Sequence, residues 1–207
     1  NSYCQDSPIS WYDWDLAPWQ NDLIATTRFL LRLRDEHPVM RPAAFASGRP
    51  ADGDEIADLA WYRADGEPMQ GWTWHDPATR VIQMLRSGRA LGDDDLLVVI
   101  NGSLDQVDVV LPDAHGKDWH LTWDSTWPVP RPHSSAFALA RRVRRGPAAR
   151  WRAVNPEGAR AARTGATDCR QDRPGDTTTL ESLTMRIYLS GERLEPVAEP
   201  DPAPVPA

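Results

Sequence analysis

The chain of 207 residues has little cysteine and no long apolar run. Its two cysteines, Cys4 and Cys169, lie far apart and fit no Cys-x-x-Cys or Cys/His metal spacing. We therefore expect no disulfide framework and a reducing, cytoplasmic compartment. No apolar segment approaches the roughly 18 residues that a membrane-spanning helix needs, so no membrane partner is expected.

The chain also has no excess of basic residues. Its formal net charge is −7 and its pI is near 5.2, whereas a protein that binds nucleic acid usually presents a basic face to the phosphates. The sequence contains no Gly-rich phosphate loop and no nucleophile-elbow motif. His75 and His120 have no partners at ligand spacing. We therefore expect no nucleic-acid partner, no metal and no cofactor.

Apolar residues recur with helical spacing over residues 18–36. Pro18 suits the first turn of a helix, and the residues that recur at i, i+3, i+4 and i+7 form a broad apolar face. The apolar side chains of this face are Leu23, Ile24, Phe29, Leu30 and Leu31. Because proline disfavours helical backbone in the residue before it, the helix should end at His37-Pro38.

From about residue 59 the apolar pattern changes to the alternation of β-strands. The predicted strands occupy residues 59–63, 80–88, 96–101, 106–112, 119–124 and 177–191. In the last of them Leu183, Met185, Ile187 and Leu189 form one face. Short strands separated by Gly, Asp and Pro turns predict an antiparallel sandwich or barrel.

Residues 138–175 have a different composition, rich in Arg and Ala and poor in Ile, Leu and Phe. Such a stretch buries too little apolar surface to offset its ordering entropy, which predicts a loosely attached insertion. A docking arm for an acidic partner and a translation artefact of a GC-rich gene are the alternatives. Residues 191–207 form a Pro-rich tail.

The chain has ten tryptophans but three phenylalanines. Tryptophan combines a large flat face with one N–H donor, which suits a sugar ring as well as a core or interface anchor. Trp72, Trp74 and Trp127 are the candidates for a sugar-binding surface. The interpretation that we favour for them is that of core or interface anchors.

The opening stretch, NSYCQDSPISWYDWDL, is crowded with rings and carboxylates but has no regular apolar period. It resembles the segment after the last barrel strand in isoamylase-type glycogen debranching enzymes of the α-amylase superfamily. The resemblance continues through LRDEHPVMR, WYRADGEPMQGWTW, DDDLLVVINGS, VVLP and LTWDSTW. It covers residues 1–133 and 175–190, and the Arg-rich stretch between them departs from the family pattern.

The resemblance implies a catalytic (β/α)8 barrel followed by a C-terminal antiparallel β-sandwich. Residues 1–37 would be the final loop and outer helix of a truncated barrel, and residues 38–58 a connector. Residues 59–190 would be the sandwich with its insertion. The fold class is therefore mainly β, with an N-terminal catalytic barrel as the missing partner.

The resemblance also implies an activity, the hydrolysis of α-1,6 branch linkages in glycogen or limit dextrin. The family's catalytic carboxylates precede the segment where this chain begins, so we expect no catalytic residue and an inactive fragment. Asn1, Tyr3 and Asp6 match the loop that would lie near the glucan. A free-standing α-glucan-binding sandwich is the alternative.

Side chains next to these loop residues are expected to support them. We expect Trp11 and Trp14 to be packing anchors beneath the loop. Cys4 is expected to be a small buried hydrophobe.

Overall fold

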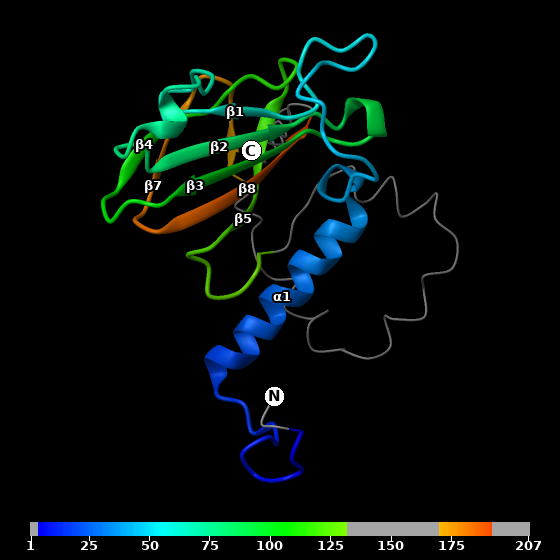
Figure 1. Cartoon of the computed structure of the whole chain (residues 1–207), viewed down its shortest axis with the longest axis vertical. Coiled ribbons are helices and arrows are strands. Elements are labelled where there is room, and N and C mark those ends of the chain that lie inside the picture. The colour runs from blue at the N-terminus through cyan, green and yellow to red at the C-terminus, as the bar shows by residue number, and fades with distance from the viewer. Residues whose placement is uncertain (1–3, 132–169, 192–207) are drawn as a thin grey trace, which may run out of the picture.

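The computed structural model of the chain describes residues 4–131 and 170–191 (Figure 1). One long helix, α1 (Pro18–Glu36), leads into a set of antiparallel strands. The mainly β fold class with a preceding helix is thereby confirmed, and the two sheets described below are consistent with a sandwich.

Helix α1 has the bounds that its sequence predicts. Pro18 occupies its first turn, and the Gln20 side chain accepts a hydrogen bond from the Ala17 N–H at 2.8 Å, which caps the N-terminal end. At the other end His37 is extended, as expected before Pro38, and its N–H donates to the Leu33 carbonyl. The short helix η1 (Pro38–Met40) follows directly.

The strands form two antiparallel sheets in the described part of the chain. One sheet has the order β1-β2-β3-β8-β5-β6, and the other pairs β4 with β7. The strands are β1 (Ala60–Tyr62), β2 (Val81–Arg86), β3 (Leu96–Asn101), β4 (Val107–Val110), β5 (Asp118–Asp124), β6 (Gln171–Asp172), β7 (Thr177–Leu180) and β8 (Thr184–Gly191). The connections contain the short helices η2 (Thr73–His75) and η3 (Arg89–Leu91).

The main core lies between the two sheets. Val109 of β4 and Leu180 of β7 belong to the same buried cluster as residues from β2, β3, β5 and β8. The full set of buried members is Val81, Leu85, Leu97, Val99, Val109, Leu111, Ala114, Trp119, Leu180 and Tyr188. Gln83 links the sheets as well, because its Nε2 donates to the carbonyls of Arg63 and Val110.

A second, smaller cluster lies on the opposite face of the six-stranded sheet. Leu96 and Leu189 pair across β3 and β8, and Leu33 and Val39 cover them from the end of α1 and from η1. Because alternate residues of a strand point to opposite faces, β3 and β8 contribute to both clusters. The end of the helix is thus part of the sandwich's packing.

The single strand predicted at 177–191 is wrong. The chain forms β7, turns at residues 181–183 and returns as β8, and these two strands belong to different sheets. Leu183 has a left-handed backbone with φ of 51° and is 65% exposed, so it does not share a face with Ile187 and Leu189. The prediction failed because the apolar alternation in the sequence continues through residues 181–183, a turn that contains no Gly or Pro.

The Arg- and Ala-rich stretch predicted at 138–175 lies mostly outside the described residues. Its last residues are described: Gln171 and Asp172 form β6, which pairs with His120 and Trp119 of β5. The Pro-rich tail lies outside the described part of the chain, except for Gly191 at the end of β8.

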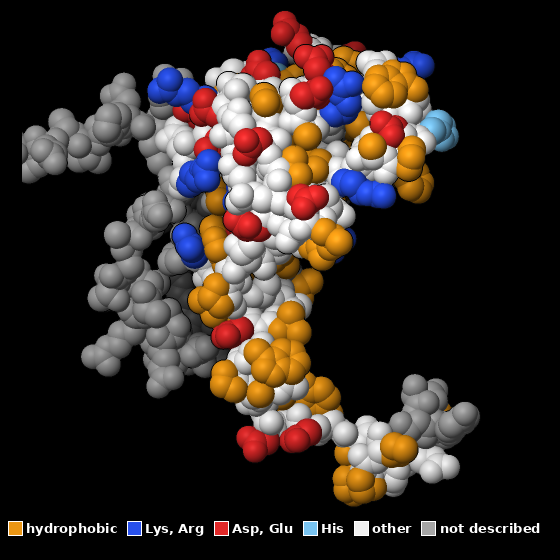
Figure 2. All heavy atoms as spheres, turned by 90° about the vertical axis from the view of Figure 1, so that its left-hand side faces the viewer, with side chains coloured by type: hydrophobic (Ala, Val, Ile, Leu, Met, Phe, Trp, Pro, Cys, Tyr) orange, Lys and Arg blue, Asp and Glu red, His pale blue; other side chains and the backbone are white. Residues whose placement is uncertain are grey.

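Helix α1 extends away from the sandwich, and we call it the stalk helix, or stalk (Figure 1). Leu33 is its buried residue, whereas Trp19, Leu23 and Leu31 are exposed. Figure 2 shows hydrophobic side chains gathered along the helix and the loop before it. Part of the apolar side of the helix, at Trp19, Leu23 and Leu31, is therefore uncovered by the described residues, whereas Ile24, Phe29 and Leu30 are half-buried.

Candidate functional site

Three loop residues were predicted to lie near substrate, and the structure describes one of them, Asp6. Asn1 and Tyr3 lie outside the described residues. Asp6 is exposed, and its Oδ1 accepts a hydrogen bond from the Trp11 indole at 2.6 Å. In the same loop, Asp13 Oδ1 accepts from the backbone N–H of Asp15 at 2.9 Å. Each of these carboxylates is thus engaged within the loop.

Two expectations about this loop are wrong for the chain as it stands. Cys4 is exposed rather than buried. Trp11 and Trp14 are exposed as well, and Trp14 reaches 80%. Trp14 contacts Tyr12 edge to face at 4.7 Å between ring centroids. The loop precedes the stalk and lies far from the sandwich (Figure 1), so these rings have no core to enter.

The most unusual polar residues are three consecutive aspartates in the turn between η3 and β3. Asp93, Asp94 and Asp95 are all buried. The turn folds tightly against Gly88, where a Cβ atom would collide with the Asp94 carbonyl. Burying adjacent carboxylates is costly unless each is hydrogen-bonded or paired. The partners of each carboxylate therefore indicate the role of the turn.

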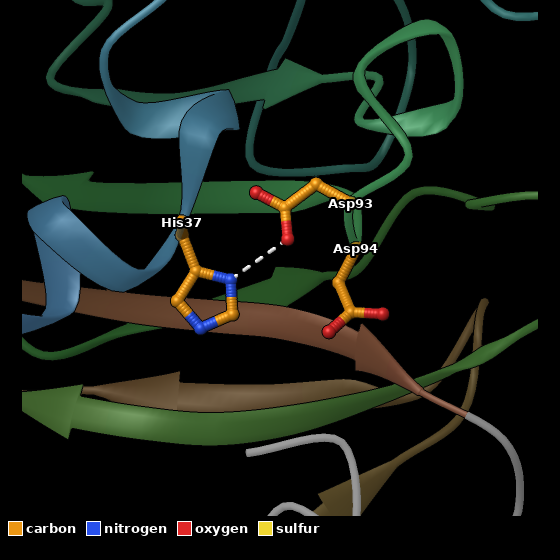
Figure 3. Close-up of side chains that lie close together, drawn as sticks. All are labelled: His37, Asp93 and Asp94. Atoms are coloured by element: carbon orange, nitrogen blue, oxygen red, sulfur yellow. Dashed lines mark hydrogen bonds and ion pairs between the residues drawn. The ribbon is translucent and has the colours of Figure 1, made fainter. Parts of the chain in front are cut away.

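Asp93 joins the end of α1 to the sheet. Its Oδ1 lies 3.0 Å from Nδ1 of His37 (Figure 3). Its Oδ2 accepts the backbone N–H of Val39 at 3.0 Å. Burial alone would raise the pKa of Asp93, but these two hydrogen bonds outweigh it and hold the pKa below its usual value. The carboxylate therefore fixes the C-terminal cap of the helix.

Asp94 has a different environment. Its side chain accepts no hydrogen bond from any residue that the structure describes, although the residue is only 5% exposed. Burial, and then the nearby Asp93 carboxylate, raise the pKa of Asp94 to about 6. Ligand atoms of His37, Asp93 and Asp94 all lie within 4.8 Å of one another.

Asp95 belongs to a second histidine cluster. His115 Nδ1 lies 2.9 Å from Asp95 Oδ2, and His115 Nε2 lies 2.5 Å from Asp54 Oδ1. Ser87 donates to the other oxygen of Asp54 at 2.8 Å. Burial alone would lower the pKa of His115, but the hydrogen bonds from its ring to Asp54 and Asp95 raise the pKa above its usual value.

The second cluster borders an open cavity of about 360 Å³. Its lining residues are Glu55, Ile56, Arg89, Asp113, His115 and Gly116. Both ring nitrogens of His115 are engaged by carboxylates, so the ring has no free nitrogen to act as a general base. The arrangement is therefore suited to holding three segments together rather than to catalysis.

Neither cluster was predicted from the sequence. Residues 93–95 were predicted only as an Asp-containing turn between two strands, and His37-Pro38 only as the end of the helix. The contacts join residues 56 and 61 positions apart, His37 to Asp93 and His115 to Asp54. The available signal was three aspartates directly before the apolar run Leu96–Ile100.

The tryptophan candidates for sugar binding form two separate groups. Trp72 and Trp74, near η2, are 64% and 50% exposed. Trp74 contacts Trp61 edge to face at 5.5 Å, and the Arg63 guanidinium lies 5.9 Å from the Trp72 ring centroid. Trp72 and Trp74 are therefore not core residues of the sandwich. Of the interpretation that we favoured, core or interface anchors, the core role is wrong for these two residues, and the interface role stays a prediction.

Trp127 lies elsewhere, after β5, which β2, β3 and β8 separate from β1 in the sheet. It is half-buried and packs beside Arg131, whose guanidinium carbon is 4.5 Å from the ring centroid. The structure thus does not bring the three tryptophans into one cluster.

The described residues include no helix that is both long and apolar enough to cross a membrane.

Comparison with known proteins identifies the strand region. Residues 58–132, which include β1 to β5, match the family described as Isoamylase, C-terminal. The chain is 33% identical over 141 residues to the glycogen operon protein GlgX homolog of Mycobacterium tuberculosis, which covers 62% of this chain and 20% of that protein.

Two other relatives give the same result. A glycogen debranching enzyme of Cronobacter sakazakii is 34% identical over 114 residues, covering 55% of this chain and 15% of the enzyme. An isoamylase of Flavobacterium is 29% identical over 131 residues, covering 61% and 17%. The chain thus spans a fifth or less of the length of these relatives. Residues 58–132 are therefore similar to the isoamylase C-terminal domain, in a chain related over part of its length to glycogen debranching enzymes.

Proposed function

We propose that the chain is the C-terminal part of an enzyme that hydrolyses α-1,6-glucosidic branch linkages in glycogen or limit dextrin. The chain by itself has no glycosidase activity in this proposal. Three of its relatives are named for glycogen or for isoamylase, and the family match covers the strand region.

The observation that carries the proposal is the uncovered apolar side of α1. Trp19, Leu23 and Leu31 are exposed on a helix that the sandwich holds only by its last turns. Exposed apolar patches of this kind mark interfaces. The outer helices of a (β/α)8 barrel bury such a side against the barrel strands. Residues 1–37 would therefore pack on a catalytic barrel in the intact enzyme.

The absence of activity follows from the chemistry of retaining glycosidases. They need two carboxyl groups held about 5–5.5 Å apart. Asp6 and Asp13 lie in an exposed loop, and their side-chain hydrogen bonds to the described residues stay within it. In the intact enzyme Asn1, Tyr3 and Asp6 would contact glucan at the rim of the barrel, because barrel active sites are built from the loops that follow the strands.

The first test is a hybrid in which this chain replaces the matching region of the Mycobacterium tuberculosis relative. The hybrid should release branches from glycogen limit dextrin, and Leu23→Asp should abolish this activity by placing a charge in the interface. Arg28→Asp is the matched control, because Arg28 lies roughly 140° around the helix from Leu23.

The isolated chain supplies the second test. It should release no reducing ends from glycogen or pullulan above a heat-killed control. Turnover that persists in a double Asp6→Asn and Asp13→Asn variant would disprove the proposal that catalysis resides outside this chain.

A second candidate function is α-glucan binding by the sandwich itself, favoured by the exposed faces of Trp72 and Trp74. Saturable binding of maltoheptaose by the chain, weakened several-fold in a folded Trp72→Ala variant, would support it. Trp14→Ala is the control, since it removes an exposed ring from the opening loop. Binding that both variants retain would argue against this surface.

A further inference from the structure

We propose that His37, Asp93 and Asp94 form a binding site for a divalent transition-metal cation of the zinc class. The three side chains come from two segments, the C-terminal cap of α1 and the turn before β3 (Figure 3). Their ligand atoms lie within 4.8 Å of one another, and all three residues are more than nine-tenths buried.

Asp94 is the observation that points to a ligand. It is 5% exposed and accepts no hydrogen bond from the residues described, while Asp93 and Asp95 are both hydrogen-bonded. Figure 3 shows one of its oxygens turned toward the His37 ring. A buried carboxylate without a donor is costly, and a cation in front of it would remove that cost.

The donor set selects the class of cation. One imidazole nitrogen with two carboxylate oxygens suits Zn²⁺, which binds His and Asp at about 2.0–2.2 Å and accepts four ligands. His37 Nδ1 and Asp93 Oδ1 are 3.0 Å apart, near the roughly 3.3 Å expected between two ligands of a tetrahedral Zn²⁺. Ca²⁺ needs six to eight oxygen ligands, more than the site offers.

The His37–Asp93 hydrogen bond is the contact that a bound cation would replace. Asp93 Oδ2 can keep the Val39 N–H, because each carboxylate oxygen accepts more than one bond. The His37 ring would exchange its hydrogen bond to Asp93 for a bond to the metal. The ion would then connect the end of α1 to the start of β3 through three protein ligands and a water molecule.

The experiment measures Zn²⁺ binding by calorimetry on the full chain with Cys4→Ser and Cys169→Ser, because free thiols compete for zinc. We expect one ion per chain and a rise in thermal midpoint that EDTA reverses. Zinc should also slow hydrogen exchange at the Val39 amide, next to the site.

Asp94→Asn is the decisive variant, because it removes a ligand and keeps the side-chain volume. Zinc affinity should fall at least about 100-fold, since even lost outer contacts of a metal site cost 10–100-fold. In EDTA the same variant should be no less stable than the parent. If it does not fold, His37→Gln takes its place in the comparison.

Controls with exposed groups separate this site from adventitious binding. His75→Ala and Asp113→Asn remove an exposed imidazole and an exposed carboxylate, and both should leave zinc binding unchanged. The proposal is overturned by unaltered affinity in Asp94→Asn, by loss of binding in His75→Ala, or by the absence of saturable binding. Tighter binding of Ca²⁺ than of Zn²⁺ would overturn the assigned class.

Discussion

The sandwich and the stalk helix contrast in what their apolar residues do. In the sandwich, Trp119 and Tyr188 are completely buried between two sheets. In α1, the apolar pattern is equally regular, yet Leu23 is 58% exposed. Hydrophobic periodicity therefore specifies the type of element in both regions, while the surface that covers it depends on residues elsewhere. The two regions should respond differently to substitution.

The largest effect is expected for Trp119→Ala in the sandwich. Trp119 is fully buried, and its indole N–H donates to the Pro112 carbonyl at 2.8 Å. The variant should lose about 3–5 kcal/mol of unfolding free energy, measured by urea denaturation. Trp14→Ala, the same change in the opening loop, should alter it by less than about 0.5 kcal/mol. Similar losses in the two variants would show that the loop is packed in solution.

A smaller and more local effect is expected where the two regions meet. Leu33 is the buried residue of α1 and packs with Leu189. Leu33→Ala should cost about 2 kcal/mol and speed hydrogen exchange throughout the last turns of α1. Leu31→Ala, two residues away and exposed, is the control. Equal effects would mean that the exposed side of the helix has a partner in solution.

The stability of the sandwich should depend on pH because of the cluster of His115, Asp54 and Asp95. The pKa of His115 is raised above 6.5 in the folded protein, because its ring is hydrogen-bonded to Asp54 and Asp95 despite burial. The stability that protonated His115 contributes through Asp54 and Asp95 is complete below about pH 6.5 and is lost as the pH rises through the raised pKa.

His115→Gln is the comparison variant for this prediction. The difference in thermal midpoint between parent and variant should shrink as the pH increases from 6.5. At the acid end, the stability that comes from the lowered pKa of Asp54 is complete above its usual value of 3.8 and is lost progressively as the pH falls below that value. A difference that grows with pH would contradict the assignment of a protonated imidazole.

The smallest effect is expected at Leu183, in the turn between the two sheets. Its left-handed backbone is strained for a leucine, whereas asparagine tolerates it. Leu183→Asn should raise the free energy of unfolding by a few tenths to about 1 kcal/mol, measured by urea denaturation. Leu183→Ala keeps the strained backbone and should give no gain.

Most elements were predictable from local sequence. Pro18 and Pro38 bracket α1, and short apolar runs located β2 and β3. Burial alternates strictly along β2, whereas Leu96 and Leu97 of β3 are both buried. The pattern failed at Leu183, where alternation continues across a turn. Local sequence contains no information on which sheet a strand joins, so the separation of β7 from β8 could not be inferred from it.

The candidate metal site was beyond sequence reasoning for a related reason. His37 and Asp93 meet only because the second apolar cluster brings the end of α1 onto the six-stranded sheet. The unpaired state of Asp94 depends on which donors surround it in three dimensions. A run of aspartates is usually solvated, and only its burial distinguishes this one.

The pairing of β5 with β6 has a consequence for how the chain tolerates change in length. Strand β5 ends at Asp124, and the chain returns at Gln171 to pair with His120 of the same strand. The two ends of the intervening segment are thus anchored to one edge of the sheet. Because the entropy of closing a loop grows only logarithmically, doubling its length costs about 0.6 kcal/mol. We therefore expect that a change in the length of the connection between β5 and β6 costs little stability.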